Sequence, residues 1–512
     1  MKFTENPKFI YFFAAISSLL LSLYIDYRES LINPDAICYL QSAAVIGAGG
    51  LRKAMNLCPQ AQWPLYSVLI YFTSLSTHLS LTVAAYVLDA LFSMLSVLMF
   101  IGIVQQLSGQ ALQHKKRILW FAALVILMAH EFNSTRSYIV RDHGFWAFYL
   151  SSLFLLVRYV EVLRWPYAFG WGITLVIATL FRIEGIIFLL LFPYVLWFRT
   201  SLSYWQRTKS FLQLSFIPLL LGVVVFGWLI FHPEISLASL GRMQDVVFQI
   251  FHAGGMIWQR FQASAQGFAH SVLTTDSFSE ASMVFFLTIL VWYFVKVVIN
   301  LSLIYSALAA YAVFRQALIW KNSSRFVVLG YLFINLVVTG LFLAEHLFLS
   351  KRYLIALSLI LMLWVPFALD RLFQQWQERQ LKSWMAGVVV VMLCVSAIGG
   401  VVRFGYSKDY MRQAGDWLAF HVEANDSLYS NDYQIMYYSK HFDNDIFQKI
   451  KEYKQEDVLA EGRWKDYDYL ALRVSKKDFS SGHGIVNEIT RAPVKIFSNA
   501  RGDQVRIYKY EH

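Results

Sequence analysis

The chain has 512 residues, of which 57% are hydrophobic, 17% aromatic and only 15% charged. Soluble proteins carry about 25% charged residues, so this composition excludes a soluble globular protein and indicates a polytopic membrane protein. The formal net charge is +11. No basic stripe with interleaved aromatic residues accompanies it, so the charge does not indicate a nucleic-acid-binding protein.

Long apolar runs recur along the chain, and we expect each of them to cross the ~30 Å hydrocarbon core of a bilayer. The first run lacks a small-residue cleavage site, so it is interpreted as a retained anchor and not as a cleaved signal peptide. The predicted spans are residues 9–25, 84–107, 118–137, 144–160, 166–181, 184–198, 211–231, 284–314, 326–344, 353–369 and 384–402. The predicted fold class is therefore a polytopic α-helical membrane protein of about eleven spans.

The distribution of lysine and arginine sets the orientation of these spans, because short cytoplasmic loops accumulate both residues. With the N-terminus in the cytoplasm, every cytoplasmic loop is basic. These loops carry Lys2 and Lys8; Lys115, Lys116 and Arg117; Arg158 and Arg164; Arg199, Arg207 and Lys209; Arg315, Lys321 and Arg325; and Arg371, Arg379 and Lys382. Residues 63–79 are also apolar, but a crossing there would invert all later loops. We therefore expect an interfacial or re-entrant helix on the outer face.

The first outer loop, residues 26–83, contains Asp35 within the stretch NPDAICYL. An aspartate after proline is a good helix cap. It is equally a carboxylate available for acid–base chemistry, and both roles can hold at once. Cys38 and Cys58 lie in the same loop. In an oxidising compartment they can form a disulfide, and two unpaired thiols are the alternative.

Asp142 lies in a tight turn between two predicted spans, flanked by Arg141 and His143. The predicted topology puts Asp142 on the same side of the membrane as Asp35. A turn carboxylate paired with arginine is the simple interpretation. Polar groups at membrane depth are costly and tend to be functional, so two carboxylates on one face also indicate acid–base chemistry on a substrate delivered from lipid.

Two further groups of polar residues flank later spans on the outer side. Arg182 and Glu184 lie between the spans 166–181 and 184–198, where an interfacial ion pair is the simple explanation. The second group consists of Glu345, His346, Lys351, Arg352 and Tyr353. Such residues often anchor a span at the membrane boundary. A guanidinium also suits phosphate, because its planar fork can bond two oxygens at once.

The chain changes character near residue 403. We expect residues 1–402 to form the transmembrane domain, with a second large outer loop at 232–283, and residues 403–512 to form a small α/β domain. Acidic and basic residues balance in the second part, so the net charge lies in the first. The periodicity predicts helices at 410–422 and 448–459, and strands at 427–430, 469–474, 494–498 and 504–510. An odd number of spans places this domain outside the cytoplasm.

Taken in order, these stretches resemble the GT-C glycosyltransferases, in the branch of protein O-mannosyltransferases and lipid A aminoarabinose transferases. Asn33–Leu40 resembles the first-loop acidic motif of the family, and Arg141–Gly144 stands where the family has its second loop aspartate. Trp63–Tyr66 resembles a Pro-Pro-Leu-Tyr segment with one proline missing. Leu180–Gly185 resembles a Thr-Arg/Lys-x-Glu-Gly turn, and Arg352–Leu354 resembles a Glu-Arg-Tyr segment in which Lys351 replaces the acid. Gly415–Leu418 and Tyr429–Asp432 resemble the start of the outer C-terminal domain.

The resemblance implies transfer of a sugar from a polyprenyl-phosphate donor to an acceptor hydroxyl, with inversion, at the outer face of a bacterial cytoplasmic membrane. Asp35 would be the catalytic base and Asp142 would orient the acceptor or the base. The candidate substrate-binding residues are Arg141, His143, Arg182, Glu184, His346, Lys351, Arg352 and Tyr353. Some relatives use a divalent metal, but these residues specify no metal site. A single acid replaces the Asp-Glu pair of the mannosyltransferases, so the acceptor (a lipid, a glycan or a protein) stays open.

Three other interpretations remain at this point. A transporter or flippase for lipid-linked saccharides would use the same acids as ion relays, although the inverted repeats common in transporters are not evident. A polymerase or ligase would place its large loop between late spans, whereas here the polar part is terminal. The third alternative is a catalytically inactive scaffold.

Overall fold

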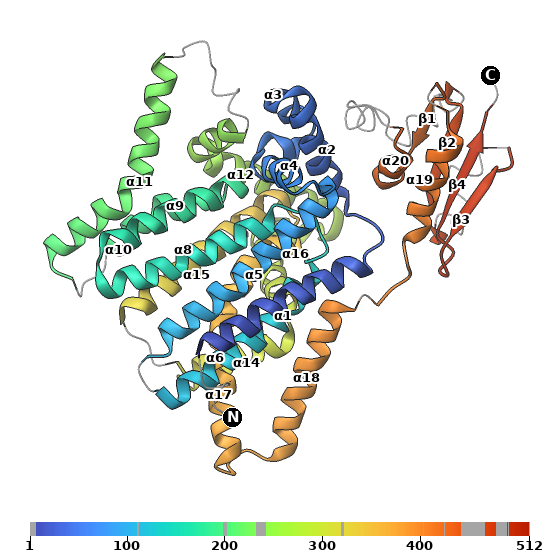
Figure 1. Ribbon diagram of the computed structural model, residues 1–512. Coiled ribbons are helices and arrows are strands. Elements are labelled where there is room, and N and C mark those ends of the chain that lie inside the picture. Colours follow the sequence, from blue (N-terminus) through green and yellow to red (C-terminus); the bar gives the residue numbers. More distant parts are fainter. Residues whose placement is uncertain are drawn as a thin grey trace. The chain divides into compact units, whose positions relative to one another are not determined.

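The computed structural model describes residues 7–109, 112–197, 202–231, 242–318, 322–402, 404–423, 425–441, 466–477, 489 and 491–510. The chain divides into two compact units. The first consists of Met1–Ser22, Asp89–Arg136 and Arg141–Val402, and the second of Leu23–Leu88, Ser137–Val140 and Arg403–His512. The regular secondary structure in the described residues of the first unit is helical, and the strands belong to the second (Figure 1).

Eight helical segments in the described residues are long and apolar enough to cross a membrane. They are α1 (Pro7–Arg28), α5 (Leu81–Leu107), α8 (Asp142–Val162), α11 (Tyr204–Phe231), α13 (Ala281–Leu301), α15 (Asn322–His346), the continuous segment α16 (Lys351–Leu361), η5 (Met362–Trp364) and α17 (Val365–Gln377), and α18 (Ser383–Val401). Four shorter apolar helices accompany them: α4 (Leu65–Thr77), α9 (Trp165–Phe181), α10 (Gly185–Trp197) and α14 (Leu303–Phe314). The predicted class, a polytopic helical membrane protein, is confirmed.

The remaining helices connect these segments. They are α2 (Pro34–Gly49), α3 (Leu51–Met55), η2 (Pro59–Gln62), α6 (Leu112–Leu127), α7 (His130–Ser134), α12 (Arg242–Val272) and η4 (Thr275–Glu280). Two predicted spans are interrupted. The span 284–314 is divided between α13 and α14 by Ser302, whose φ of 71° lies outside the helical region. The span 118–137 is divided between α6 and α7 by Ala129, which has extended backbone.

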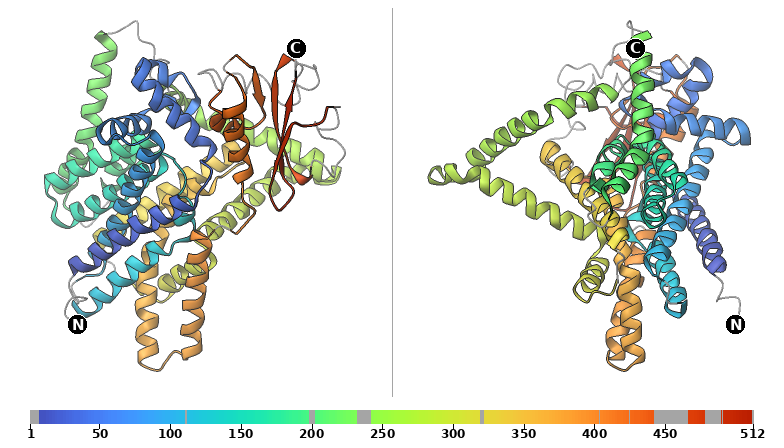
Figure 2. Two further views of the ribbon diagram at one scale, coloured as in Figure 1. Left: turned by 45° about the vertical axis from the view of Figure 1, so that its right-hand side comes forward. Right: turned by 90° about the vertical axis from the view of Figure 1, so that its left-hand side faces the viewer.

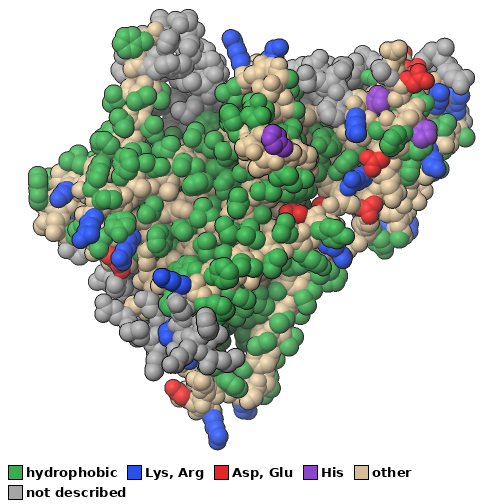
Figure 3. Space-filling model, in the orientation of Figure 1, with side chains coloured by type: hydrophobic (Ala, Val, Ile, Leu, Met, Phe, Trp, Pro, Cys, Tyr) green, Lys and Arg blue, Asp and Glu red, His purple; other side chains and the backbone are tan. Residues whose placement is uncertain are grey.

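Several long helices expose apolar side chains around most of their surface. Only 6% of the apolar window of α18 and 11% of that of α13 are buried. On the face shown in Figure 3, hydrophobic side chains cover most of the helical surface. Exposed apolar surface of this extent marks a membrane-facing region, because water would not tolerate it.

Buried polar contacts link three helices of the first unit, α8, α9 and α15. Helix α9 packs along α8, and α15 packs on the same helix (Figure 2). The hydroxyl of Tyr331 on α15 lies 2.9 Å from Ser152 Oγ on α8 and accepts a hydrogen bond of 3.0 Å from Trp171 on α9. Hydrogen bonds of this kind link transmembrane helices where the hydrophobic effect does not distinguish lipid from protein.

The second unit contains a four-stranded sheet with two helices. The strands are β1 (Leu428–Ser430), β2 (Tyr469–Val474), β3 (Lys495–Ser498) and β4 (Gln504–Lys509), in the order β1-β2-β4-β3, with β1 parallel to β2 and the other pairs antiparallel. The helices are α19 (Asp409–His421) and α20 (Tyr433–Ser439). The predicted helix at 410–422 and all four predicted strands are confirmed. Helix α20 was not predicted, and the predicted helix at 448–459 lies outside the described residues.

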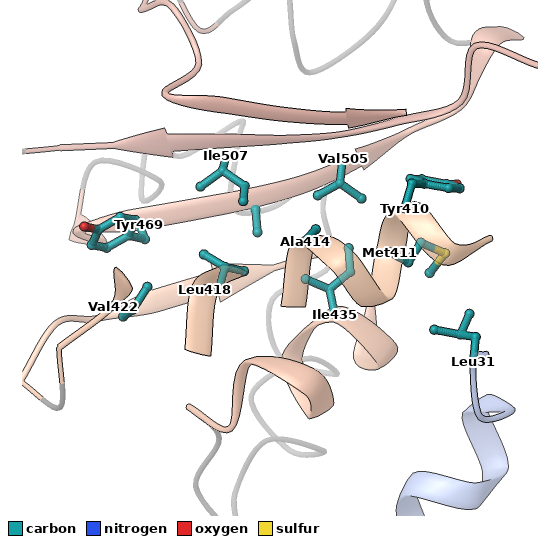
Figure 4. Close-up of a cluster of buried hydrophobic side chains, with 11 residues drawn as sticks. Leu31, Tyr410, Met411, Ala414, Leu418, Val422, Ile435, Tyr469, Val505 and Ile507 are labelled. Atoms are coloured by element: carbon teal, nitrogen blue, oxygen red, sulfur yellow. The ribbon is translucent and has the colours of Figure 1, made fainter. Parts of the chain in front are cut away.

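The core of this domain includes a residue from the first loop. Helix α19 contributes Met411 and Leu418, β4 contributes Ile507, and Leu31 completes the cluster (Figure 4). Main-chain hydrogen bonds fix the same segment, because Arg412 donates to the carbonyl of Ser30 at 3.0 Å and Ile32 donates to the Tyr438 hydroxyl at 3.0 Å. Residues 30–32 therefore fold as part of the C-terminal domain.

The rest of the first loop forms a small helical group in the same unit. A disulfide joins Cys38 of α2 to Cys58, next to η2. Helix α4 packs on α2. Its 13 residues span about 20 Å at 1.5 Å per residue, which is less than the ~30 Å of a hydrocarbon core. The length of α4 agrees with the interfacial helix that we expect at 63–79, and its location on the outer face stays a prediction.

Candidate active site

The first unit contains a buried ion cluster centred on Arg182. This residue follows the last residue of α9 and has extended backbone, which turns the chain toward α10. Its Nη1 donates to Asp142, its Nη2 donates to Oε1 of Glu184, and its Nε donates to Oε2 of the same carboxylate at 3.3 Å. One guanidinium thus connects two of the predicted site carboxylates.

The backbone around the cluster explains why these groups meet. Asp142 is the first residue of α8, where the positive end of the helix dipole favours a carboxylate. Two residues later, Gly144 lies so close to the Phe181 ring that a Cβ atom would not fit. Because Gly144 has no side chain, the start of α8 can approach the end of α9, and Arg182 follows Phe181 directly.

The cluster is largely withdrawn from solvent. The side chains of Arg182 and Asp142 are 9% and 7% exposed, and that of Glu184 is 29% exposed. Buried charges are expensive unless they are paired and hydrogen-bonded. Here Arg182 satisfies both carboxylates, so the cluster is a rigid platform and not an isolated charge.

Two more arginines give the cluster an excess of positive charge. Arg141 and Arg352 both act electrostatically on Asp142, and Arg141 also acts on Glu184. Three guanidinium groups therefore surround two carboxylates, which leaves one net positive charge. Within the described part of the chain, Nη1 of Arg141 is buried and has no hydrogen-bond partner. A donor in this state is suited to an anionic ligand.

A cavity of about 40 Å³ adjoins the cluster. A cavity needs about 10–15 Å³ to hold one water molecule, so this one accommodates a compact group such as a phosphate and not a whole saccharide. Helices α8, α10, α15 and α16 and the turn before α10 supply its walls. The lining residues are Phe145, Trp146, Arg182, Glu184, Phe188, Asn335, Val338, Thr339, Phe342, Arg352, Tyr353 and Ala356.

Aromatic rings hold the central guanidinium in place. The Cζ atom of Arg182 lies 4.4 Å from the ring centre of Tyr353 and 5.7 Å from that of Phe145. Phe342 in turn packs edge-on against Tyr353, with ring centres 4.8 Å apart. These rings add cation–π attraction and exclude water, which strengthens the electrostatic interactions of the cluster.

Three of the predicted site residues lie apart from this cavity. His143 is fully buried, and its ring nitrogens contact Ser93 Oγ at 3.3 Å and the carbonyl of Thr135 at 3.1 Å. Lys351 forms an ion pair of 2.6 Å with Glu131. His346 stacks on Phe342 with ring centres 4.3 Å apart and does not line the cavity. Contacts of this kind stabilise the packing of the helices.

Asp35 belongs to the second unit, whereas the cluster at Arg182 belongs to the first. Asn33 occupies the N-cap position of α2, and Asp35 is partly exposed in the first turn of that helix. The Asn33 side chain bonds the main chain of Ile139 twice, donating to its carbonyl at 3.3 Å and accepting from its N–H at 2.8 Å. Because the helix begins one residue before the aspartate, the N-cap position predicted for Asp35 is occupied by Asn33, whose side chain makes no capping hydrogen bond.

The sequence analysis missed three polar residues of this region. Asn335 and Thr339 lie one helical turn apart on α15 and face the cavity. Their four-residue spacing inside the apolar span 326–344 was an available signal, since polar groups in a span tend to be functional. The third is Glu131, which is nearly buried and pairs with Lys351; no local pattern connects the two.

The described residues contain no preformed metal-binding site. No group of three or more His, Cys, Asp and Glu side chains is arranged there to hold an ion. The cluster at Arg182 contains two carboxylates that are both bound to a guanidinium. It does not fit a divalent cation, and we derive no step through one.

Comparisons with known proteins give matches only among solved structures. No protein-family model and no curated protein matches the sequence. The oligosaccharyltransferase of Archaeoglobus fulgidus, in complex with Zn and sulfate, is 13% identical with a TM-score of 0.49 over 85% of this chain. ArnT from Cupriavidus metallidurans in the apo state is 13% identical with a TM-score of 0.42, over 96% of this chain and 97% of that one.

The same ArnT bound to undecaprenyl phosphate is also 13% identical, with a TM-score of 0.42 over 97% of each chain. The match to the oligosaccharyltransferase extends over 57% of that protein, so this chain spans little more than half of its length.

Proposed function

We propose that the protein is a membrane glycosyltransferase that moves a sugar from a polyprenyl-phosphate donor to the hydroxyl of a lipid, glycan or protein acceptor. The observation that supports this function is the buried cluster of Arg141, Asp142, Arg182, Glu184 and Arg352 beside a phosphate-sized cavity. Charged groups in a membrane protein are costly and are retained where they serve a ligand. The surplus positive charge suits an anionic one.

We expect the positive charge of the cluster to act on the leaving group, the lipid phosphate. As the acceptor oxygen bonds to the anomeric carbon, the bond from that carbon to the phosphate oxygen breaks, and its electron pair remains on the lipid phosphate. We assign Arg352, which lines the cavity, and Arg141, which acts on the same cluster, to stabilise this developing charge, an effective form of catalysis in a site that excludes water. Arg182 is engaged by both carboxylates, so we assign it as a positioning residue.

The acceptor hydroxyl loses a proton in the same step, and a carboxylate within hydrogen-bond reach can accept it. We assign Asp35 as this general base on the strength of its sequence context, and Asp142 as the group that orients the acceptor or the base. A single displacement at the anomeric carbon inverts its configuration. No nucleotide takes part, because the donor carbon is already activated by its phosphate.

We place the reaction at the outer face of the bacterial cytoplasmic membrane. The basic loops assign the N-terminus to the cytoplasm and the C-terminal domain to the outer side. The Cys38–Cys58 disulfide lies in the first outer loop. Disulfides persist in oxidising compartments, which agrees with that side of the membrane.

Mass spectrometry of the cell envelope tests the reaction. We expect cells without the protein to lack one sugar on one class of lipid, glycan or protein. Restoring wild-type protein should return that sugar, whereas D35N and D35A should not, at equal membrane levels. Loss of whole saccharide chains would instead indicate a flippase or polymerase. Full activity of both variants would exclude Asp35 as the base.

A binding measurement tests the phosphate site separately. Undecaprenyl phosphate is titrated into the purified protein in lipid nanodiscs. R352Q should weaken binding about tenfold, the equivalent of about 1.4 kcal/mol for one charge-assisted contact. R325Q is the matched control, since Arg325 is an exposed arginine on α15. Equal affinity of R352Q and wild type would contradict the assignment of Arg352.

A further inference from the structure

The C-terminal domain contains a second and larger cavity that the proposed reaction does not use. Its volume is about 230 Å³, and the described residues that line it are Tyr410, Arg473, Ser475, Lys477, Arg501 and Asp503. They come from the start of α19, the end of β2 and the segment after it, and the turn between β3 and β4. All six belong to the second unit.

This cavity concentrates positive charge locally. Three cations line it against one carboxylate, although acidic and basic residues balance over residues 403–512 as a whole. The local excess is therefore a property of the folded arrangement and not of the composition. A concave site lined by one sign of charge raises the local concentration of counter-ions, and here those are anions.

The turn that carries Arg501 is held in one conformation. The side-chain carbonyl of Asn499 accepts hydrogen bonds from the N–H groups of Arg501, Gly502 and Asp503 at 3.0, 3.1 and 3.0 Å. Gly502 has a φ of 98°, which a residue with a side chain rarely adopts. The turn is thus a specific structure that fixes the main chain of Arg501 at the rim of the cavity.

Hydrogen bonds also fix Asp503 and Arg473, two other residues that line the cavity. The Lys476 N–H donates to Asp503 Oδ1 at 3.0 Å, and Asn499 Nδ2 donates to the other carboxylate oxygen at 3.2 Å. Arg473 donates to Asp432 at 2.8 Å. The charge of Arg473 is therefore partly compensated, and Lys477 and Arg501 are the other two cations of the lining.

The remaining lining groups suit hydroxyls better than a second anion. Burial raises the pKa of the Tyr410 phenol, so it stays protonated and can donate a hydrogen bond. Ser475 can donate or accept, and the Asp503 carboxylate only accepts. A carboxylate repels inorganic phosphate but binds a sugar hydroxyl, so the cations and the other polar groups of the lining favour different parts of one ligand.

We propose that this cavity binds a phosphate monoester carried on a saccharide. Lys477 and Arg501 bind the phosphate, while Asp503, Tyr410 and Ser475 bind sugar hydroxyls. A volume of 230 Å³ is below the 300–1,000 Å³ or so of pockets for drug-sized ligands and fits a compact headgroup. The ligand is either a free sugar phosphate or the phosphorylated headgroup of a glycolipid, since both present the same chemistry.

Calorimetric titration of the full-length protein in nanodiscs of zwitterionic lipid tests the site. Glucose 1-phosphate should bind saturably, glucose should not bind, and inorganic phosphate should bind at least about tenfold more weakly. The double variant K477Q/R501Q should weaken binding of glucose 1-phosphate by about tenfold or more, because charge-assisted hydrogen bonds are lost. Both side chains are exposed, so folding should be unaffected.

The matched control is K495Q/R506Q, which removes the same charge of two from β3 and β4, at residues that do not line the cavity. It should retain wild-type affinity within about twofold, because salt largely screens charges that do not contact the ligand. Absence of saturable binding, unchanged binding by K477Q/R501Q, or an equal loss in both double variants would each overturn the proposal. These outcomes are independent of Asp35 and Arg352, so they leave the proposed reaction untouched.

A competition experiment identifies the source of the ligand. The same titration is repeated in nanodiscs that contain phosphatidic acid, a lipid with a phosphate monoester headgroup. If phosphatidic acid weakens the binding of glucose 1-phosphate, the site binds the phosphorylated headgroup of a membrane lipid. If the affinity for glucose 1-phosphate is unchanged, the ligand is a free sugar phosphate.

Discussion

Replacing Arg182 by methionine should destabilise the first unit strongly. The change leaves Asp142, whose side chain is 7% exposed, and Glu184 without their shared partner. Removing one member of a buried ion pair costs about 3–5 kcal/mol, because a charge remains uncompensated. The contact with the Tyr353 ring, at 4.4 Å, is lost as well. We expect the free energy of unfolding to fall by about 3–5 kcal/mol and sugar transfer to cease.

A double-mutant cycle separates this effect from simple loss of packing. D142N/R182M removes both the charge and its partner. We expect it to be more stable than the sum of the single variants by about 1–3 kcal/mol, the range of coupling between residues in direct contact. A surface change such as R325M should stay within about 0.5 kcal/mol of wild type.

Equilibrium unfolding in bicelles measured by steric trapping is the appropriate assay, since thermal scans of large proteins are often irreversible and report rates. Wild-type stability of R182M would refute the reasoning, because the cluster would then not need its central cation. Strict additivity in the cycle would refute it too, since it would mean that Arg182 and Asp142 do not interact.

Three further predictions follow from other parts of the structure. C38S/C58S opens a cross-link between residues 20 apart and should lower the free energy of unfolding by about 3 kcal/mol, as measured by steric trapping; reduced wild type should match it. G144A forces a Cβ against the Phe181 ring and should cost about 1–3 kcal/mol and slow transfer; normal activity would exclude close packing there. A backbone N–H bond holds the pKa of Asp503 below its usual range although partial burial opposes this. The stabilisation from the Asp503 carboxylate should therefore be complete above about pH 4 and disappear as the pH falls further, so the free energies of unfolding of D503N and wild type, measured by steric trapping, should converge in acid.

The membrane class and most elements of the C-terminal domain, though not helix α20, were determined by the sequence alone. Apolar runs of span length and loops rich in lysine and arginine are local properties, because they depend on transfer from water to lipid residue by residue. The helix at 410–422 and the strands at 469–474 and 504–510 were likewise predicted, since alternation and helical spacing report which face of an element is buried. The turns that carry Asp142 and Arg182 were located in the same way.

The partners of the charged side chains were decided only by the tertiary structure. Arg182 and Asp142 are 40 residues apart, and Lys351 and Glu131 are 220 residues apart. Helix packing brings them together, and hydropathy carries no information about which helices are neighbours. His143 shows the converse, because its place beside Asp142 in the sequence predicted a site residue, whereas α8 directs its ring to Ser93 and Thr135. One helical residue rotates a side chain by about 100°, so adjacent residues face different surroundings.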